Sequence, residues 1–338
     1  MKSIRFAIVG AGVISHHHAR AIAKHPQAEL AAVSDVYEPS AAKLAEQYPS
    51  ASVYADYGKM LARNDIDAVC VCVPSGQHAD VAVAAAQAGK HILCEKPLEI
   101  TRERIDLMVR TAREYGVKLG AVFQRRTMPA AIAARNAVKE GKLGKIVLGD
   151  AYLKYYRSQE YYDGAGWRGT WAMDGGGALM NQGVHGVDLI QWMVGEVESV
   201  FARAAALARD IEVEDTAVAV LKYRNGAFGV IQAATTVYPE TETRFEIHGE
   251  KGTIVLGDSG IKTWAFIDEE TAPIAPDSQQ SGTNASLSGH DILLDDMIHA
   301  IVEDRDPMVP GEEAAKAVDL ILAIYESART GKEVLLGR

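Results

Sequence analysis

The chain has 338 residues and is 48% hydrophobic, which is enough for two domains with sizeable cores. Its net charge of −10 and its lack of any lysine- and arginine-rich block exclude a nucleic-acid-binding surface. No apolar run approaches the length of about 18 residues that a membrane span needs, and charged Lys2 and Arg5 lead straight into a strand, so we expect a cytoplasmic protein without membrane segments. The three cysteines, Cys70, Cys72 and Cys94, lie in apolar runs typical of reduced core thiols, and no metal site is predicted.

The first predicted element is a short apolar strand at residues 4–9, followed by the turn G-A-G-V-I-S and an alanine-rich helix. Gly10 permits the tight turn, and Gly12 lets the backbone approach a pyrophosphate. The free amides and the dipole at the start of the helix, where Val13 and Ile14 stand, favour that negative charge. The sequence therefore predicts a dinucleotide site at these four residues.

A second strand at residues 30–33 ends at Asp35. An acidic side chain at this place accepts hydrogen bonds from the ribose 2′-hydroxyl of NAD and repels the 2′-phosphate of NADP. We therefore predict NAD as the cofactor, with NADP less favoured. The alternative is that Asp35 only caps a helix or a turn.

The apolar run at residues 67–73 is typical of a strand buried on both faces of a parallel sheet, and it ends in P-S-G-Q-H. Loops at the carboxyl ends of such strands face the ligand crevice, so Pro74, Ser75 and His78 are candidate cofactor contacts. For His78, a place at the start of the next helix is the alternative. The alternation continues with helices at 79–88 and 102–115 and strands at 91–94 and 118–122. This pattern predicts a doubly wound parallel sheet.

The motif Glu95-Lys96-Pro97 follows the strand at 91–94 directly. A lysine at the mouth of the crevice can hydrogen-bond a substrate hydroxyl and help to move its proton, so Lys96 is a candidate catalytic residue. Pro97 fixes the turn and permits a cis bond after Lys96. Glu95, Lys96 and, where the pattern changes, Gln124 are also candidate cofactor contacts.

After residue 122 the pattern changes to strands separated by turns such as Asn225-Gly226, as antiparallel hairpins require. The predicted strands are residues 146–156, 197–207, 215–223, 228–237, 244–248 and 253–256; the predicted helices are 129–139, 291–303 and 312–330; and 268–289 is predicted to be a loop. We therefore expect two domains, 1–122 and 123–338, the second an α/β domain with a large, mostly antiparallel open sheet. Its last helix can pack back on the first domain, and an apolar open face would need a partner subunit.

Two stretches of this second half, residues 155–162 and 167–171, are rich in aromatic residues and arginine. Flat aromatic faces and forked guanidinium groups suit sugars and their carboxylate or phosphate groups. Candidate substrate contacts are therefore Arg125, Arg157, Trp167 and Arg168. The alternative is a structured loop at a domain or subunit contact, because interfaces use the same residue types.

The run G-G-G-A-L-M-N-Q-G-V-H-G-V-D spans residues 175–188 and is compatible with a helix. Asn181 and His185 stand four residues apart, so on an α-helix they share a face, and Asp188 can lie on the same side. A buried histidine with an amide and a carboxylate beside it can be held in one tautomer and act as a base or acid near neutral pH. The alternative is a core histidine beside a glycine turn.

The motifs G-A-G-V-I-S, E-K-P and G-G-G-A-L-M-N-Q-G-V-H-x-x-D occur in this order, and together they resemble the Gfo/Idh/MocA family over essentially the whole chain. This family includes glucose–fructose oxidoreductase and inositol dehydrogenases. The resemblance implies an NAD(P)-binding Rossmann domain and an α/β domain whose open sheet forms a dimer contact, often within a tetramer. It also implies that Lys96 is the active-site lysine and His185 the catalytic histidine.

One residue departs from the family pattern. Many of its sugar and inositol dehydrogenases carry aspartate four residues before the histidine, where this chain has Asn181. An amide cannot accept a proton in the same way, so Asn181 is expected to orient the substrate or His185 and to leave proton transfer to His185 and Lys96. The N-Q-G-x-H form is similar to the branch that contains UDP-N-acetylglucosaminuronate 3-dehydrogenases.

The sequence thus predicts an NAD-dependent oxidoreductase that oxidises a secondary hydroxyl of a sugar, sugar acid, nucleotide sugar or cyclitol to a ketone, or runs the reverse. Lys96, Arg125, Arg157, Trp167, Arg168, Asn181 and His185 are its candidate substrate contacts. The alternatives are tightly bound NAD recycled in a redox-neutral sugar conversion, and a non-catalytic NAD-binding protein. A homodimer or homotetramer formed through the second sheet is expected.

Overall fold

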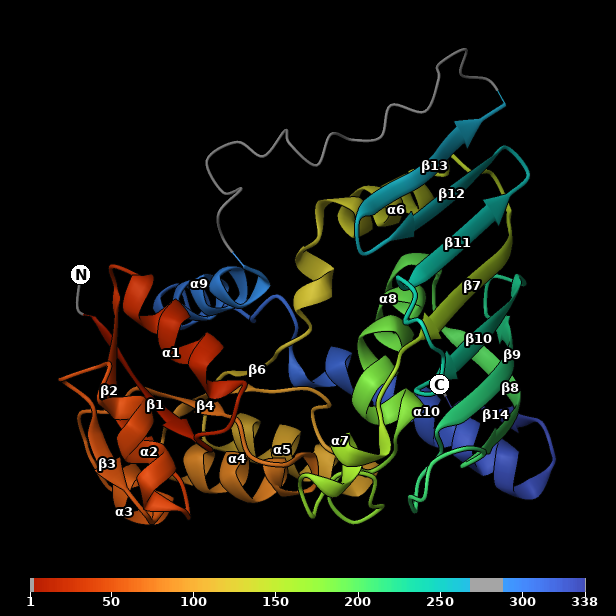
Figure 1. Cartoon of the computed structure of the whole chain (residues 1–338). Helices are drawn as coiled ribbons and strands as arrows, with labels where there is room; N and C mark the ends of the chain where they lie inside the picture. The colour runs from red at the N-terminus through yellow and green to blue at the C-terminus, as the bar shows by residue number, and fades with distance from the viewer. Residues whose placement is uncertain (1–2, 268–287, 338) are drawn as a thin grey trace. The chain divides into compact units, whose positions relative to one another are not determined.

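The computed structural model describes residues 3–267 and 288–337, and it divides into two compact units (Figure 1). The first unit contains the residues up to 124 together with the segment 288–315, and the second contains the remaining described residues. The sequence alone places a single boundary after residue 122 and does not assign the segment 288–315 to the first unit. The predicted loop at 268–289 lies outside the described residues as far as residue 287.

The first unit is built on a six-stranded parallel sheet with the order β3-β2-β1-β4-β5-β6. Its strands are β1 (Ile4–Val9), β2 (Ala28–Ser34), β3 (Ser52–Tyr54), β4 (Ala68–Val71), β5 (His91–Cys94) and β6 (Leu119–Ala121), connected by helices α1 (Ser15–Lys24), α2 (Glu38–Ala45), α3 (Tyr57–Leu61), α4 (His78–Gln87) and α5 (Arg102–Glu114). The order reverses between β1 and β4, and the carboxyl ends of strands at such a switch point form the ligand crevice. The predicted doubly wound parallel sheet is confirmed.

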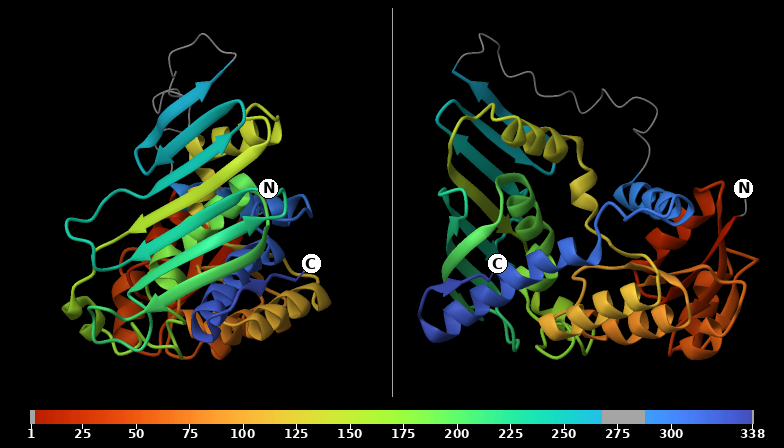
Figure 2. Two further views of the ribbon diagram at one scale, coloured as in Figure 1. Left: turned by 90° about the vertical axis from the view of Figure 1, so that its right-hand side faces the viewer. Right: turned by 180° about the vertical axis from the view of Figure 1, so that it is seen from behind.

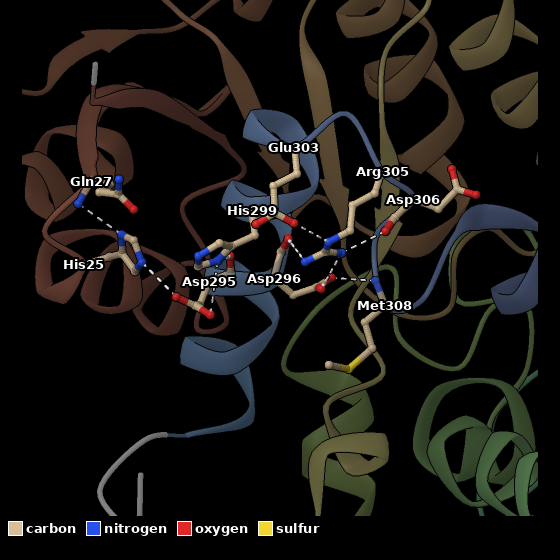
Figure 3. Close-up of polar contacts among 9 residues, drawn as sticks. All are labelled: His25, Gln27, Asp295, Asp296, His299, Glu303, Arg305, Asp306 and Met308. Atoms are coloured by element: carbon tan, nitrogen blue, oxygen red, sulfur yellow. Dashed lines mark hydrogen bonds and ion pairs between the residues drawn. The ribbon is translucent and has the colours of Figure 1, made fainter. Parts of the chain in front are cut away.

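The segment after residue 287 joins this first unit through helix α9 (Gly289–Val302), which packs against α1. Figure 3 shows its polar contacts. His25 Nε2 lies 3.1 Å from Asp295 Oδ1, and the Gln27 amide donates to His25 Nδ1, so the histidine proton of this pair stands on Nε2. Just beyond the helix, Arg305 forms an ion pair of 2.8 Å with Asp296. These contacts fix the middle of α9, where Asp295 and Asp296 lie.

The second unit is built on an eight-stranded sheet with the order β13-β12-β11-β7-β10-β9-β8-β14. Its strands are β7 (Ile146–Lys154), β8 (Val197–Ala205), β9 (Thr216–Tyr223), β10 (Phe228–Ala234), β11 (Arg244–Gly249), β12 (Gly252–Gly257), β13 (Gly260–Phe266) and β14 (Val334–Leu335). Neighbouring strands are antiparallel except β7 and β10, which run parallel. The predicted mostly antiparallel sheet is confirmed, although β13 and β14 were not predicted.

Helices cover one face of this sheet and leave the other open, as Figure 2 shows. The helices of the second unit are α6 (Pro129–Lys139), α7 (Gln159–Asp163), α8 (Val184–Val194) and most of α10 (Gly311–Thr330). Burial alternates along β9, where Val218 and Val220 are 45% and 52% exposed while their neighbours are buried. Phe201 and Phe228 add to this exposed apolar face. Within the described residues, no helix has both the length and the hydropathy to cross a membrane.

Candidate active site

The glycine turn after β1 fits a dinucleotide through its backbone. Gly10 has a φ of 95°, and a Cβ there would lie 2.5 Å from the carbonyl oxygen of Cys72, so only glycine fits against the end of β4. A Cβ at Gly12 would meet no described atom within 4 Å, so the turn is open above this residue. Val13 is 82% exposed at the start of α1, and Ile14 is half-buried. The open turn therefore lies at the amino end of a helix, where a pyrophosphate is stabilised.

Asp35 lies directly against this turn. Its Oδ2 accepts a hydrogen bond of 2.7 Å from the amide of Ala11, and its Oδ1 accepts one of 2.8 Å from the amide of Tyr37. Asp35 therefore stabilises the turn through its side chain, which was one of its two predicted roles. Each carboxylate oxygen has a second lone pair, so these bonds leave acceptor capacity for a ribose hydroxyl.

His78 holds together two loops at the crevice edge of the sheet. It is buried as the first residue of α4, with Nδ1 2.8 Å from the carbonyl oxygen of Pro97 and Nε2 3.0 Å from that of Val73. Burial lowers its pKa, against the opposing effect of these carbonyl groups. The Lys96-Pro97 bond is cis, as the sequence permits. His78 thus connects the E-K-P turn to the loop after β4. In that loop, Ser75 begins the short 3₁₀ turn Ser75–Gln77, and Pro74 directly precedes it.

Glu95 is the centre of a buried cluster that the sequence did not predict. Its Oε1 accepts from His18 Nε2 at 2.8 Å and from His290 Nε2 at 3.2 Å, and its Oε2 accepts from the amide of Lys96. Burial by itself would raise the pKa of Glu95, but the hydrogen bonds from both histidines outweigh it and hold the pKa well below its usual value. Two histidines and a carboxylate are residue types that also bind metal ions. Here the hydrogen bonds already explain why the three side chains lie close together. The cluster fixes the backbone at Lys96, whose side chain is half-buried.

In the second unit, the glycine-rich run forms a helix of two kinds. Residues Ala178–Gly183 form a π-helix, in which the amide of Gln182 donates to the carbonyl of Gly177, and α8 begins at Val184. Asn181 therefore lies in the π-helix and His185 in the α-helix that follows, so the run is not one regular α-helix, because a π-helix holds more residues per turn. His185 is buried in the first turn of α8, and Asn181 is half-buried.

Asp188 forms a buried ion pair with Arg126. Its two oxygens accept from Arg126 Nε at 2.8 Å and Arg126 Nη2 at 2.6 Å, and both side chains are at least 95% buried. Such a forked pair fixes orientation as well as charge. Asp188 thus forms a buried ion pair that anchors α8, and its place beside His185 stays a prediction.

A polar network connects three of the predicted substrate contacts of this unit, Arg157, Arg168 and Asn181. Gln182 accepts from Arg157 Nε at 3.1 Å and donates to Asn181 Oδ1 at 3.2 Å and to the hydroxyl of Tyr161 at 3.1 Å. The Arg168 guanidinium stacks on the Tyr161 ring at 4.3 Å. The aromatic and arginine-rich stretch is therefore a structured loop that reaches the helix of Asn181 and His185.

The other predicted contacts lie at different places in the chain. Trp167 stands beside Arg168, 5.6 Å from its guanidinium. Arg125 lies apart from this network and binds Thr243 Oγ1 at 2.8 Å and Asp258 at 2.9 Å. Gln124 ends the first of the two chain segments that make up the first unit, and it begins the 3₁₀ turn Gln124–Thr127. Lys96 belongs to the first unit and His185 to the second, so each is described within its own unit.

Two sequence models of one oxidoreductase family match the chain. The model described as an oxidoreductase family with an NAD-binding Rossmann fold matches residues 4–123. The model described as the GFO/IDH/MocA C-terminal domain matches residues 131–255. Each of the two predicted domains is therefore matched, the second over residues 131–255.

Individual proteins extend this similarity. The myo-inositol 2-dehydrogenase of Thermotoga maritima is 30% identical over 273 residues, which are 79% of this chain and 79% of the relative. The WlbA dehydrogenase from Bordetella pertussis, solved in complex with NADH and UDP-GlcNAcA, is 38% identical with a TM-score of 0.91 and covers 100% of both chains. The WlbA dehydrogenase from Chromobacterium violaceum, solved with the same two ligands, is 37% identical with a TM-score of 0.92 over 100% of this chain and 97% of that one.

Proposed function

The chain belongs to the Gfo/Idh/MocA oxidoreductase family, and from this premise we propose that it oxidises a secondary hydroxyl of a nucleotide-linked sugar acid to a ketone with NAD. The observation that carries the proposal is the full-length similarity, at 38% identity, to a dehydrogenase solved with NADH and UDP-GlcNAcA. Carbon 3 of the sugar is the proposed position, by analogy with the branch that the N-Q-G-x-H motif resembles. The arginine and aromatic residues near Asn181 suit the charged groups of such a substrate.

The first unit offers what an NAD site requires. Gly10 and Gly12 form an open turn at the amino end of α1, and Asp35 is held against that turn by the Ala11 amide. We propose that the helix amides bind the pyrophosphate and that Asp35 accepts from the ribose. NAD, when bound, supplies the hydride acceptor. Proposed contacts beyond the turn come from the loop of Pro74 and Ser75.

The proton steps are assigned to two residues. His185 is proposed to take the hydroxyl proton, because it is buried on α8 and imidazole titrates near neutral pH. Lys96, fixed at its backbone by Glu95, is proposed to hydrogen-bond the same hydroxyl and to stabilise the developing oxyanion. Asn181, which cannot act as a base, is proposed to orient the substrate.

Binding of the rest of the substrate is assigned to arginine and aromatic groups. Arg157 and Arg168 are proposed to bind its carboxylate or phosphate groups, and Trp167 to pack on an apolar face of a ring. Arg125 is also proposed to contact the substrate, with its charge already balanced by Asp258 at 2.9 Å. For the open face of the second sheet, we propose a second copy of this chain, because Val218, Val220 and Phe228 leave it apolar.

The function is tested by following nicotinamide reduction with NAD and with NADP against UDP-linked uronates, free uronates, sugars and cyclitols. Reduction of NAD with a UDP-linked uronate, and not with free sugars, is the expected result. Reduction with a cyclitol alone would overturn the proposed substrate class. Turnover without added NAD, in protein that retains the cofactor, would favour recycling of NAD, whereas NAD binding without any turnover would favour a non-catalytic protein.

Changing Asp35 to serine is expected to raise the KM for NAD about tenfold and to reduce the preference for NAD over NADP. The reason is that a charged hydrogen-bond acceptor contributes roughly 1.5–3 kcal/mol, and its loss also removes repulsion of the 2′-phosphate. Asp56→Ser is the matched control, because Asp56 accepts from the Gly58 amide at 2.8 Å to cap α3 in the same unit. If the ratio of kcat/KM with NAD to kcat/KM with NADP is unchanged in Asp35→Ser, the proposed contact of Asp35 with the ribose is contradicted.

A further inference from the structure

Asp174 is a buried carboxylate beside the residue that departs from the family pattern. It stands immediately before the three glycines and is 1% exposed. One oxygen, Oδ2, accepts from the amide of Gly169 at 2.9 Å. The other, Oδ1, accepts a short hydrogen bond from Nδ2 of Asn181. A carboxylate thus lies against residue 181 although residue 181 itself carries none.

These contacts fix the orientation of the Asn181 amide. A carboxylate is only an acceptor, so the side of the amide turned toward Asp174 must be the NH₂ group. Gln182 Nε2 donates to Asn181 Oδ1 at 3.2 Å, which requires the carbonyl group on that side. Gln182 is oriented in turn, because its own oxygen accepts from Arg157 Nε. The two partners therefore select the same one of the two amide orientations.

The pair also explains why asparagine suits position 181. An aspartate there would place two carboxylates at hydrogen-bond distance in a site where Asp174 is almost fully buried. Two carboxylates so close cannot both stay ionised, and one of them holds a proton to higher pH. With asparagine, the site keeps one negative charge, one acceptor group and one donor group at defined places.

We propose that Asp174 is a positioning residue of the active site, which orients and polarises the Asn181 amide so that the two residues act as one unit toward the substrate hydroxyl. This proposal rests on the proposed function, since it assigns a substrate contact to Asn181. In this pair the carboxylate stands at residue 174, behind the amide of residue 181. Proton transfer stays with His185 and Lys96, and Asp174 supplies orientation.

The test is a reciprocal exchange of the two side chains. Asp174→Asn leaves two amides, so the fixed orientation is lost, and kcat is expected to fall about 10- to 100-fold with KM and NAD binding nearly unchanged. Asn181→Asp leaves two carboxylates, and kcat is expected to fall at neutral pH and to gain a new ionisation in its pH profile. The double variant restores one donor and one acceptor, so its melting temperature and kcat are expected to exceed those of both single variants.

Asp215→Asn is the matched control. Asp215 is 0% exposed in the same unit and accepts from three backbone amides, at residues 207, 208 and 209, without touching Asn181. This variant is expected to lower the melting temperature and to leave kcat and its pH profile unchanged. If Asp174→Asn behaves in the same way, or if the losses of the two single changes simply add in the double variant, Asp174 is only a structural cap of the glycine turn.

Failure of this proposal is distinct from failure of the proposed function. Lack of turnover by the unaltered protein with every compound of the panel overturns the proposed function and the role that rests on it. Turnover by the unaltered protein together with full kcat in Asp174→Asn overturns the positioning role alone.

Discussion

Replacing His185 by alanine is expected to lower kcat about 100- to 10,000-fold, because a positioned general base contributes a factor of this size. The Kd for NAD is expected to stay nearly unchanged, since the turn and the acidic residue that suit NAD belong to the first unit. Steady-state turnover with the best substrate of the panel and a separate titration of NAD binding measure the two quantities. The pH profile of kcat/KM is also expected to lose the limb that the base contributes.

His299→Ala is the control for this prediction, because it removes an imidazole whose side chain is 43% exposed on α9. His299→Ala is expected to leave both kcat and the Kd for NAD unaltered. A loss of NAD binding in His185→Ala as large as the loss of kcat would instead identify His185 as a core residue whose removal disturbs the fold. The two roles predicted from the sequence, base and core histidine, thus give different results.

Replacing Asp188 by alanine is expected to destabilise the second unit by about 3–5 kcal/mol, which is typical of breaking one side of a buried ion pair. The cost arises because Arg126, 5% exposed, loses the carboxylate that balances its buried charge. Denaturant unfolding followed by a signal from the second unit measures the change. Asp163→Ala, at an exposed site on α7, is the control and is expected to change stability by less than about 0.5 kcal/mol.

The paired replacement Arg126→Met with Asp188→Leu separates the charge from the shape of this contact. Apolar side chains of similar volume commonly replace a buried ion pair with little loss, so most of the stability is expected to return. A double variant as unstable as Asp188→Ala would show that the forked geometry, and not the unpaired charge, holds α8 in place.

Local patterns predicted those parts of the protein whose structure depends on neighbours in sequence. The buried run of β4 and the turn at Gly10 follow from hydrophobic pattern and glycine chemistry, and both are found as expected. The π-helix Ala178–Gly183 was not predicted, because one wide turn leaves no periodic signal in the sequence. Helix α8 that follows it has the expected burial.

The side-chain partners depend on distant residues and could not be predicted in the same way. Asp188 finds Arg126 across 62 residues, and Glu95 finds His290 across 195. No spacing rule connects such positions. The one available signal for the Glu95 cluster was an acid directly after an apolar strand and next to a predicted active-site lysine, since a carboxylate buried there requires donors.

The parallel pairing of β7 with β10 determines how the second unit can fold. Because these strands run the same way, the chain between them must cross over, and this crossover contains α7, the π-helix, α8 and two strands of the sheet. The contact of Val230 with Asp150 in the middle of the sheet spans 80 residues. Long-range pairing of this kind forms late and slowly, since the loop it closes must first be ordered. The central strands and the segment of Asn181 and His185 are therefore expected to gain protection from hydrogen exchange together, as one cooperative folding step.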